Sequence, residues 1–461
     1  MFEDLEDRLR SVPERVEGRA PNAAPRPDGG RVIREVMDPA FLRARLRGLQ
    51  RPATRHQKLA ARAYEEAEAE LAEAATGANR SVPFMPRTPT NSILQSLLTS
   101  CIEARAGELL RDLPSGLNRL AHAILSDAEV FRQYGPCDPG WILTGIAEGL
   151  ARIDSKPPFP DEPAPPVRLA DDARVVVVGD WGTGLPGAVS VAQQIRKWLA
   201  DAGDRQQHVI HLGDVYYCGW REEYQTRFLP HWPVDPDNRG ALSWALAGNH
   251  DMYSGGHGYF GFLLHDPRFR GHWRGDPATQ PPSSHFSIEN EHWQVVALDS
   301  SYRDHDLMGS QEQWLSEKLS SGRKTMLLTH HQPFTAYAGD VPQAMSEKVQ
   351  RALPAGRTLD AWLWGHEHRC SIYGDHPKPY LKFGSCIGNG GVPLLMPDPP
   401  LAPLPESPAH APLMWAYDGA EEVDGNEWLG FGFAVLDFDG PRVTIRYLDE
   451  KNTEVHGATL D

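Results

Sequence analysis

Six short apolar runs, each ending in polar residues, constrain the fold of this chain more than any other feature. Within residues 173–368 they read ARVVVVGD, HVIHLGD, SWALAGNHD, WQVVALDS, TMLLTHH and LDAWLWGHEH. Short continuous apolar runs are typical of buried strands, and helix-like stretches such as AVSVAQQIRKWLA lie between some of them. Strands alternating with helices predict an α/β core, where ligands gather beyond the carboxyl ends of the strands. The polar ends of the runs are therefore the predicted functional site.

The chain outside these runs contains four further parts. Residues 1–155 contain helix formers at helical spacing, as in TRHQKLAARAYEEAEAELAEAA, and predict a helical accessory domain. KPPFPDEPAPP holds six prolines in eleven residues, which predicts an extended linker over 156–170 before a catalytic domain over 171–461. A second proline-rich stretch, 392–414, predicts a surface loop, and 430–450 predicts a hairpin turning at Asp439-Gly440.

Composition limits the compartment and the partners. No run approaches the roughly 18 apolar residues of a membrane span, and the charged N-terminus has no secretory pattern. The five cysteines are odd in number and form no C-x-x-C pair, which is typical of free thiols in a reducing compartment. We expect a cytoplasmic protein without a membrane partner. The net charge of −16 disfavours nucleic acid as a partner, because an acidic surface repels phosphate backbones.

The segment Gly182-Thr-Gly184-Leu-Pro-Gly187 matches the dinucleotide-binding pattern G-x-G-x-x-G literally. In that pattern the first glycine directly ends a strand, whereas here Gly179-Asp180-Trp181 intervenes. A lone match is weak evidence. We favour the interpretation that these glycines let the chain turn sharply and aim Asp180 at a common centre.

The ends of the runs carry carboxylates, a phenol, a carboxamide and imidazoles. Carboxylate and imidazole together suit Fe, Mn or Zn, and no cysteine-rich cage competes with them. The residues that the strand ends supply are Asp180, Asp214, Tyr217, Asn249, His250, Asp251, His330, His331, His366 and His368.

Five blocks, GDWG, GDVYY, GNHD, LLTH and GHEH, resemble in this order the calcineurin-like metallophosphoesterases. They are most similar to the purple acid phosphatase branch, which carries GDxG, GDxxY, GNH(D/E), a strand ending in histidine, and GHxH. The resemblance covers roughly residues 172–450 and implies a sandwich of two β-sheets flanked by helices, with the site at their edge. Most of the superfamily has D-x-H in the first block. Here Gly182 replaces that histidine, and Tyr217 is the compensating ligand that the branch implies.

The resemblance implies two metal ions, Fe(III) and a divalent Fe, Zn or Mn ion. Asp214 would bridge them, the first ion would take Asp180, Tyr217 and His368, and the second would take Asn249, His330 and His366. The choice between His330 and His331 stays open, because the strand TMLLT favours His330 and the sequence H-x-P favours His331. If their segment is extended, His366 and His368 share one face.

The implied activity is hydrolysis of phosphomonoesters by a metal-activated hydroxide, with a small phosphorylated substrate. His250 and Asp251 are the expected catalytic residues, and His250 and His331 are expected to bind substrate. One alternative is a phosphodiesterase acting on small phosphodiesters or nucleotides. Another is a non-catalytic scaffold on a phosphoesterase fold, which the complete set of ligand positions disfavours.

Overall fold

The computed structural model describes residues 156–461 apart from 217, 220, 238–239, 254, 338–340, 342, 375–378, 397–406, 408 and 424–425. The helical domain predicted over 1–155 lies outside the described residues, as does much of the predicted loop over 392–414. Among the described helices, none combines the length and the apolar content that a membrane span requires.

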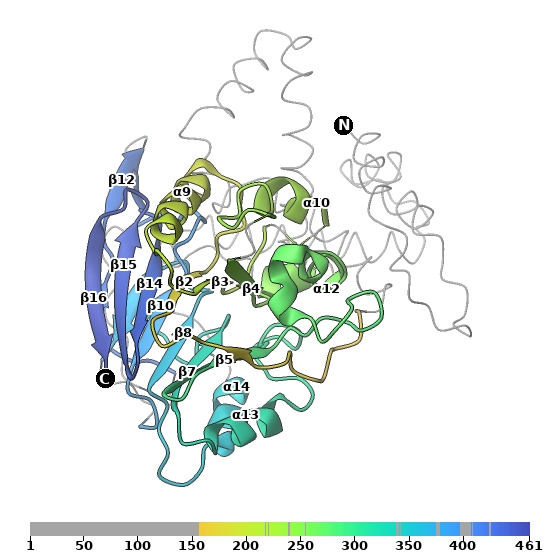
Figure 1. Ribbon diagram of the computed structural model, residues 1–461. Coiled ribbons are helices and arrows are strands. Elements are labelled where there is room, and N and C mark those ends of the chain that lie inside the picture. The colour runs from red at the N-terminus through yellow and green to blue at the C-terminus, as the bar shows by residue number, and fades with distance from the viewer. Residues whose placement is uncertain are drawn as a thin grey trace, which may run out of the picture.

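Two β-sheets form the centre of the described region (Figure 1). The six-stranded sheet has the order β16 (Glu454–Leu460), β15 (Arg442–Asp449), β14 (Gly432–Asp439), β2 (Arg174–Val178), β3 (Gln207–His211), β4 (Ala241–Ala245). The eight-stranded sheet has the order β1 (Val167–Arg168), β5 (Phe286–Glu289), β6 (Trp293–Ala297), β7 (Lys324–Thr329), β8 (Ala361–Trp364), β10 (Gly384–Ile387), β9 (Cys370–Tyr373), β11 (Leu413–Ala416). A separate pair joins β12 (Ala420–Val423) to β13 (Asn426–Leu429).

The six apolar runs of the sequence are β2, β3, β4, β6, β7 and β8, so the α/β prediction is confirmed. Strands β2, β3 and β4 are parallel neighbours, and so are β6, β7 and β8. Parallel neighbours end at the same edge of their sheet, which gathers the polar residues that follow them. The predicted hairpin is also confirmed, because β14 and β15 pair antiparallel and Gly440 has a φ of 56° in the turn.

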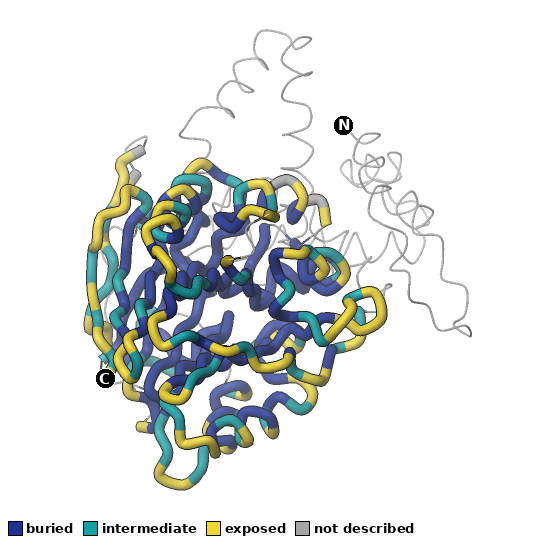
Figure 2. Tube along the Cα trace, viewed as in Figure 1, coloured by how far each residue is buried: buried dark blue, intermediate teal, exposed yellow. Residues whose placement is uncertain are grey.

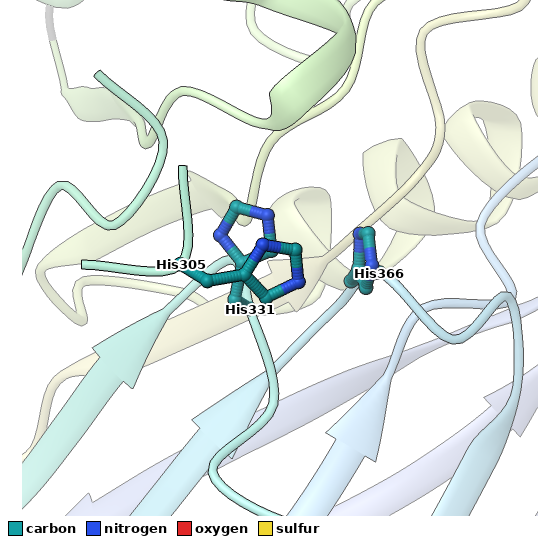
Figure 3. A group of neighbouring side chains, drawn as sticks. All are labelled: His305, His331 and His366. Atoms are coloured by element: carbon teal, nitrogen blue, oxygen red, sulfur yellow. The ribbon is translucent and has the colours of Figure 1, made fainter. Parts of the chain in front are cut away.

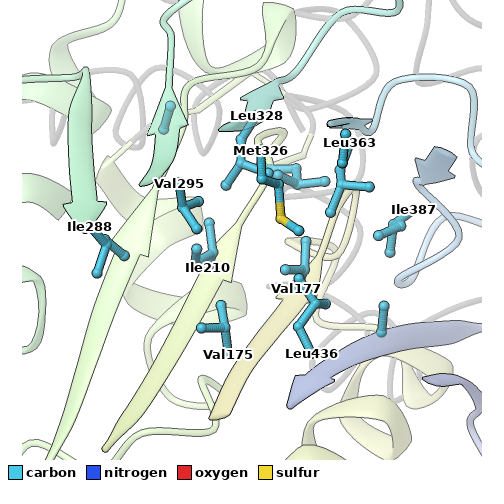
Figure 4. Packing of buried hydrophobic residues seen from close by; sticks show 14 of the residues in the cluster. Val175, Val177, Ile210, Ile288, Val295, Met326, Leu328, Leu363, Ile387 and Leu436 are labelled. Carbon is cyan, nitrogen blue, oxygen red and sulfur yellow. The ribbon is translucent and has the colours of Figure 1, made fainter. Parts of the chain in front are cut away.

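The main core lies between the two sheets. Successive side chains along β2 show how the six-stranded sheet buries apolar residues on both of its faces. Val175 and Val177 belong to the cluster between the sheets, together with Met326 of β7 (Figure 4). Val176 and Val178 belong to the cluster on the other face, under helix α9 (Pro186–Ala200). Successive side chains of a strand point to opposite faces, so a run of valines buries both.

Helices cover the outer faces of both sheets. Helix α9 begins with a proline at its first turn, where no N–H is needed, and covers the six-stranded sheet. The same side carries α10 (Arg221–Glu223), the π-helix η2 (Tyr224–Phe228), α11 (Asn249–Tyr253), α12 (His257–Gly261) and the 3₁₀ turns η3 (Leu263–His265) and η4 (Pro267–His272). Helices α13 (Gln311–Leu319) and α14 (Ala344–Ala352) pack on the outer face of the eight-stranded sheet. Figure 2 shows the buried strands enclosed by a more exposed surface.

The proline-rich segment 156–166 forms no helix or strand and follows the surface of this sandwich. The Phe159 ring stacks on His285 with centroids 5.6 Å apart, and the Ala164 N–H donates to the His285 carbonyl at 3.0 Å. The segment is therefore packed against the domain it precedes.

Candidate metal centre

The carboxyl ends of strands from both sheets converge on one buried centre. Asp180 follows β2, Asp214 follows β3, Asn249 follows β4, His330 follows β7, and His366 and His368 follow β8. One ligand atom from each of Asp180, Asp214 and His368 lies within 4.8 Å of the others, and the same holds for Asp214, His330 and His366. Up to 188 positions separate these residues in the sequence. They lie close together in space because the edges of the two sheets meet here.

The second cluster consists of Asp214, Asn249, His330 and His366. Asn249 Oδ1 lies 3.0 Å from both His330 Nε2 and His366 Nδ1, and these two ring nitrogens are 3.1 Å apart. His330 Nδ1 lies 2.9 Å from the Leu212 carbonyl oxygen, which only accepts, so Nδ1 carries the proton. The lone pair of Nε2 therefore faces the cluster, as in a metal-binding histidine.

The first cluster consists of Asp180, Asp214, Tyr216 and His368. The Tyr216 hydroxyl lies 3.1 Å from Asp180 Oδ1, 3.0 Å from Asp214 Oδ2 and 2.8 Å from His368 Nε2. The expected ligand Tyr217 lies outside the described residues, and Tyr216 is the tyrosine that the structure places here.

The alternation of successive side chains explains why Tyr216 points into the first cluster. Val215, the residue before it, is fully buried in the cluster under α9 and forms a bridge to Gly182. The next side chain then points the opposite way, toward the carboxylates. The apolar residue between Asp214 and Tyr216 was the signal in the sequence that could have identified this tyrosine.

Unusual backbone conformations aim the site residues. Asp180, Asp214, His366 and His368 have φ values of 54°, 75°, 68° and 51°, in the left-handed region that residues other than glycine rarely adopt. Each such residue costs roughly 1–3 kcal/mol, and such strain concentrates at functional sites. The expectation of an extended segment at His366 and His368 is wrong, because the chain turns at both residues.

Close backbone approaches hold these turns. The His366 N–H donates to Asp180 Oδ2 at 2.7 Å, and a Cβ on Gly365 would lie 2.7 Å from the same oxygen. Between the two histidines, the buried Glu367 carboxylate accepts from Trp364 Nε1 at 2.7 Å and anchors the loop, as expected for a structural residue. Residue 365 must be glycine here, because any side chain at this position would clash with the Asp180 carboxylate.

Asp251 contacts backbone groups of the site. Its Oδ2 accepts from the Gly248 N–H at 2.7 Å and from the Asp214 N–H at 2.9 Å, and its other oxygen accepts from the Tyr224 hydroxyl. Burial raises the pKa of Asp251 to about 7. These hydrogen bonds hold Asp214 in place, so Asp251 acts on the site as a positioning residue.

The two remaining expected site residues lie beside the clusters. The His250 N–H donates to Asp214 Oδ1 at 2.9 Å, and the His250 ring lies 4.4 Å from the Tyr216 ring, centroid to centroid. The His331 ring is 4.9 Å from that of His330 and 4.7 Å from that of His366. His331 therefore borders the second cluster, whereas His330 takes part in it.

The electrostatics of the centre suit cations. Asp180 and Asp214 are fully buried, and their described ion-pair contacts are with histidines. Burial, followed by the charge of Asp180, raises the pKa of Asp214, and burial also raises the pKa of Tyr216. Burial lowers the pKa of His330, which keeps its imidazole neutral and able to bind a metal. Buried anionic oxygens beside neutral nitrogens form a donor set that bound metal ions would stabilise.

The glycine-rich segment has a packing function. Gly182 pairs with Val215, and a Cβ on Gly187 would overlap the ring of Phe431. Both contacts are with other protein groups, and the interpretation that the segment serves Asp180 stays a prediction.

The sequence does not single out His305 from the other loop histidines, which are expected to be exposed or packed, and it gives no role to Asp304; both lie in the loop between β6 and α13. The ring centroid of His305 lies 3.8 Å from that of His331. Nothing in the pattern around His305 separates it from an ordinary surface histidine, so its position emerges only from the fold.

Comparisons with known proteins agree with this geometry. Residues 173–370, less than half of the chain, match the family model described as calcineurin-like phosphoesterase. No curated protein sequence is close enough to count as a match.

Similar solved structures include GAP50, the anchor in the inner membrane complex of Plasmodium. It has a TM-score of 0.40 and 11% identity over 63% of this chain and 89% of that one. A dimetal phosphatase from Danio rerio has a TM-score of 0.37 and 14% identity over 65% of this chain and 99% of that one. The family match spans the strands that supply the two clusters, so this part of the chain is similar to the calcineurin-like phosphoesterases.

Proposed function

We propose that this protein is a dinuclear metal-dependent phosphoesterase that hydrolyses phosphomonoesters. The position of Asp214 carries the proposal. Its Oδ1 lies 3.6 Å from His330 Nε2 in the second cluster, and its Oδ2 lies 3.0 Å from the Tyr216 hydroxyl in the first. A carboxylate that turns one oxygen to each cluster is suited to bridge two ions.

The donor sets favour two different ions. Asp180, Tyr216 and His368 would hold the first ion, and a phenolate with carboxylates favours Fe(III). Asn249, His330 and His366 would hold the second ion, and this more neutral set favours divalent Fe, Zn or Mn. This arrangement is purple acid phosphatase-like, with Tyr216 in the role that the sequence pattern assigned to Tyr217.

Two such ions, when bound, supply Lewis-acid chemistry that activates water and neutralises charge on the phosphoryl oxygens. The surrounding side chains position the reactants. His250 is held beside Asp214 by its own backbone N–H, and its ring is placed to donate a proton or a hydrogen bond to the leaving oxygen. His331 lies on the side of the second cluster, where it would contact the substrate. Asp251 keeps Asp214 in place without contacting the substrate.

The substrate and the compartment are part of this proposal. We propose a small phosphorylated substrate, because the centre is deeply buried and the chain is acidic. The described Cys370 and Cys386 are buried free thiols, which supports a reducing and therefore cytoplasmic setting.

Hydrolysis of p-nitrophenyl phosphate, compared with its bis ester, tests the function. We expect the metal-loaded protein to have the larger kcat/KM on the monoester, and Asp214→Asn to abolish the activity. A larger value on the bis ester would favour the phosphodiesterase alternative. Inactivity on both substrates with two ions bound would favour a scaffold.

A further inference from the structure

Three imidazoles gather beside the second cluster and form what we call the histidine trio: His305, His331 and His366. One ring nitrogen from each lies within 4.8 Å of the others. Figure 3 shows the rings of His305 and His331 next to each other, with His366 across from them. They come from three separate segments, namely the loop after β6 and the ends of β7 and β8.

Each ring of the trio turns Nδ1 to a partner outside it. His305 Nδ1 lies 2.9 Å from Asp304 Oδ1, and His331 Nδ1 lies 3.0 Å from Ser300 Oγ. His366 Nδ1 faces the second cluster, where it lies 3.0 Å from Asn249 Oδ1. The Nε2 atoms are the nitrogens that remain for the trio. Metal-binding histidines typically have this arrangement, with one nitrogen fixed by a polar partner and the other directed at the ion.

Two further observations indicate that this cluster is built to bind a ligand. His331 is fully buried, and its Nε2 has no hydrogen-bond partner, although Asp304 Oδ1 lies 3.4 Å away. A buried polar atom without a hydrogen bond is unfavourable, so a native protein rarely retains one without a use. His305 has a φ of 56°, a strained conformation that it shares with four residues of the two clusters.

We propose that the histidine trio is a third cation site, selective for zinc-like divalent ions, with Asp304 or water completing a tetrahedral set. Neutral imidazoles suit zinc, and tetrahedral zinc with Zn–N bonds of about 2.0–2.1 Å places its ligand atoms roughly 3.4 Å apart. The nitrogens of the trio lie within 4.8 Å of one another, so a bound ion would draw them together to this spacing.

Sharing His366 makes this ion the weakest of the three. If its ring serves both the second cluster and the trio, two cations share one imidazole and repel each other across it. In the wild type the third ion is therefore expected to bind last, and without the two tight ions the trio still offers its three imidazoles.

Equilibrium dialysis of the full chain against Zn²⁺ tests the proposal. The wild type is expected to bind two ions tightly and one weakly. His305→Gln should weaken only the third ion, by at least about tenfold, while keeping both tight ions. His305→Cys, which restores a zinc ligand, should recover it. His331→Asn removes a different ligand and should weaken the third ion equally. Agreement between the two variants would show that the loss does not come from misfolding of one of them.

Asp214→Asn separates this site from the proposed dinuclear centre. It should remove the tight ions and leave the weak one, since Asp214 is not in the trio. Unchanged weak binding in His305→Gln and His331→Asn would overturn the third site, whatever happens in Asp214→Asn. A weaker inhibition by inorganic phosphate in His305→Gln, with zinc binding unchanged, would also overturn it and identify the trio as an anion site.

Discussion

Replacing Asp251 by alanine separates a positioning role from a catalytic one. The substitution leaves three buried groups without their partner: the N–H groups of Gly248 and Asp214 and the hydroxyl of Tyr224. Each unsatisfied buried group costs about 1–3 kcal/mol, so we expect a loss of roughly 3–9 kcal/mol in the free energy of unfolding. Because Asp214 is freed to move, metal affinity should fall about 10–100-fold, which is typical when a residue supporting a metal ligand is lost.

The assay is phosphomonoester hydrolysis at increasing metal concentration, alongside denaturant unfolding. If Asp251 acts only through Asp214, kcat at saturating metal stays within about tenfold of the wild type. Asp251→Asn, which keeps an oxygen for the two N–H groups, should recover most of the metal affinity. A general acid or base contributes about 10²–10⁴-fold, so a kcat loss of that size at saturating metal in both variants would refute the positioning role.

Asp360→Ala provides the matched control. The Asp360 carboxylate also accepts a buried backbone hydrogen bond, from the Thr325 N–H at 2.8 Å, but it precedes β8 and lies at the end away from the clusters. Its loss should lower stability without changing metal affinity. A fall in metal affinity in this variant would mean that unfolding, and not the position of Asp214, explains the Asp251 result.

Three further predictions concern other parts of the site and the core. If Tyr216 binds Fe(III), the iron-loaded protein should be violet or pink, and Tyr216→Phe should lose both the colour and the iron, as measured by absorption and metal analysis. Tyr217→Phe should keep both. The reverse pattern would support Tyr217, the ligand that the sequence motif assigns. Gly248→Ala should destabilise the protein by about 1–3 kcal/mol and prevent metal binding, because its Cβ would overlap Asp214 Oδ1; full occupancy at normal affinity would contradict this. Burial lowers the pKa of His272 to about 4, below its unfolded value of about 6.5, so the stability it contributes is present above pH 6.5 and declines as the pH falls toward 4. Denaturant titrations should therefore show about 2 kcal/mol less stability from this group at pH 5 than at pH 7, and an equal pH dependence in His272→Gln would contradict that assignment.

The sequence was sufficient to predict the six strands that end at the site, the hairpin of β14 and β15, and the gathering of polar residues at the strand ends. Valine-rich β2 must bury both faces, so its following residue, Asp180, necessarily lies at a sheet edge. The same reasoning places Asp214 and His330. These residues follow parallel strands, and the ends of such strands are fixed by the fold and not by local conformation.

Other parts of the site depend on details that motif spacing does not carry. The motif assigns Tyr217, which lies outside the described residues, and it does not predict that Tyr216 donates to Asp214 beside the buried Val215. The turn through His366 and His368 depends on left-handed conformations that strand periodicity does not predict. His305 reaches the centre only because its loop folds over the end of β7.

Metal content per chain, measured in the wild type and in Asp214→Asn, tests the central claim most directly. Asp214 faces both clusters, so removing its bridging charge should affect both ions at once. The wild type is expected to hold two tightly bound ions per chain after removal of loosely bound metal, and Asp214→Asn is expected to hold fewer than one while remaining folded. A folded wild type without tightly bound metal, or an Asp214→Asn variant that keeps both ions, would contradict a dinuclear centre at this site.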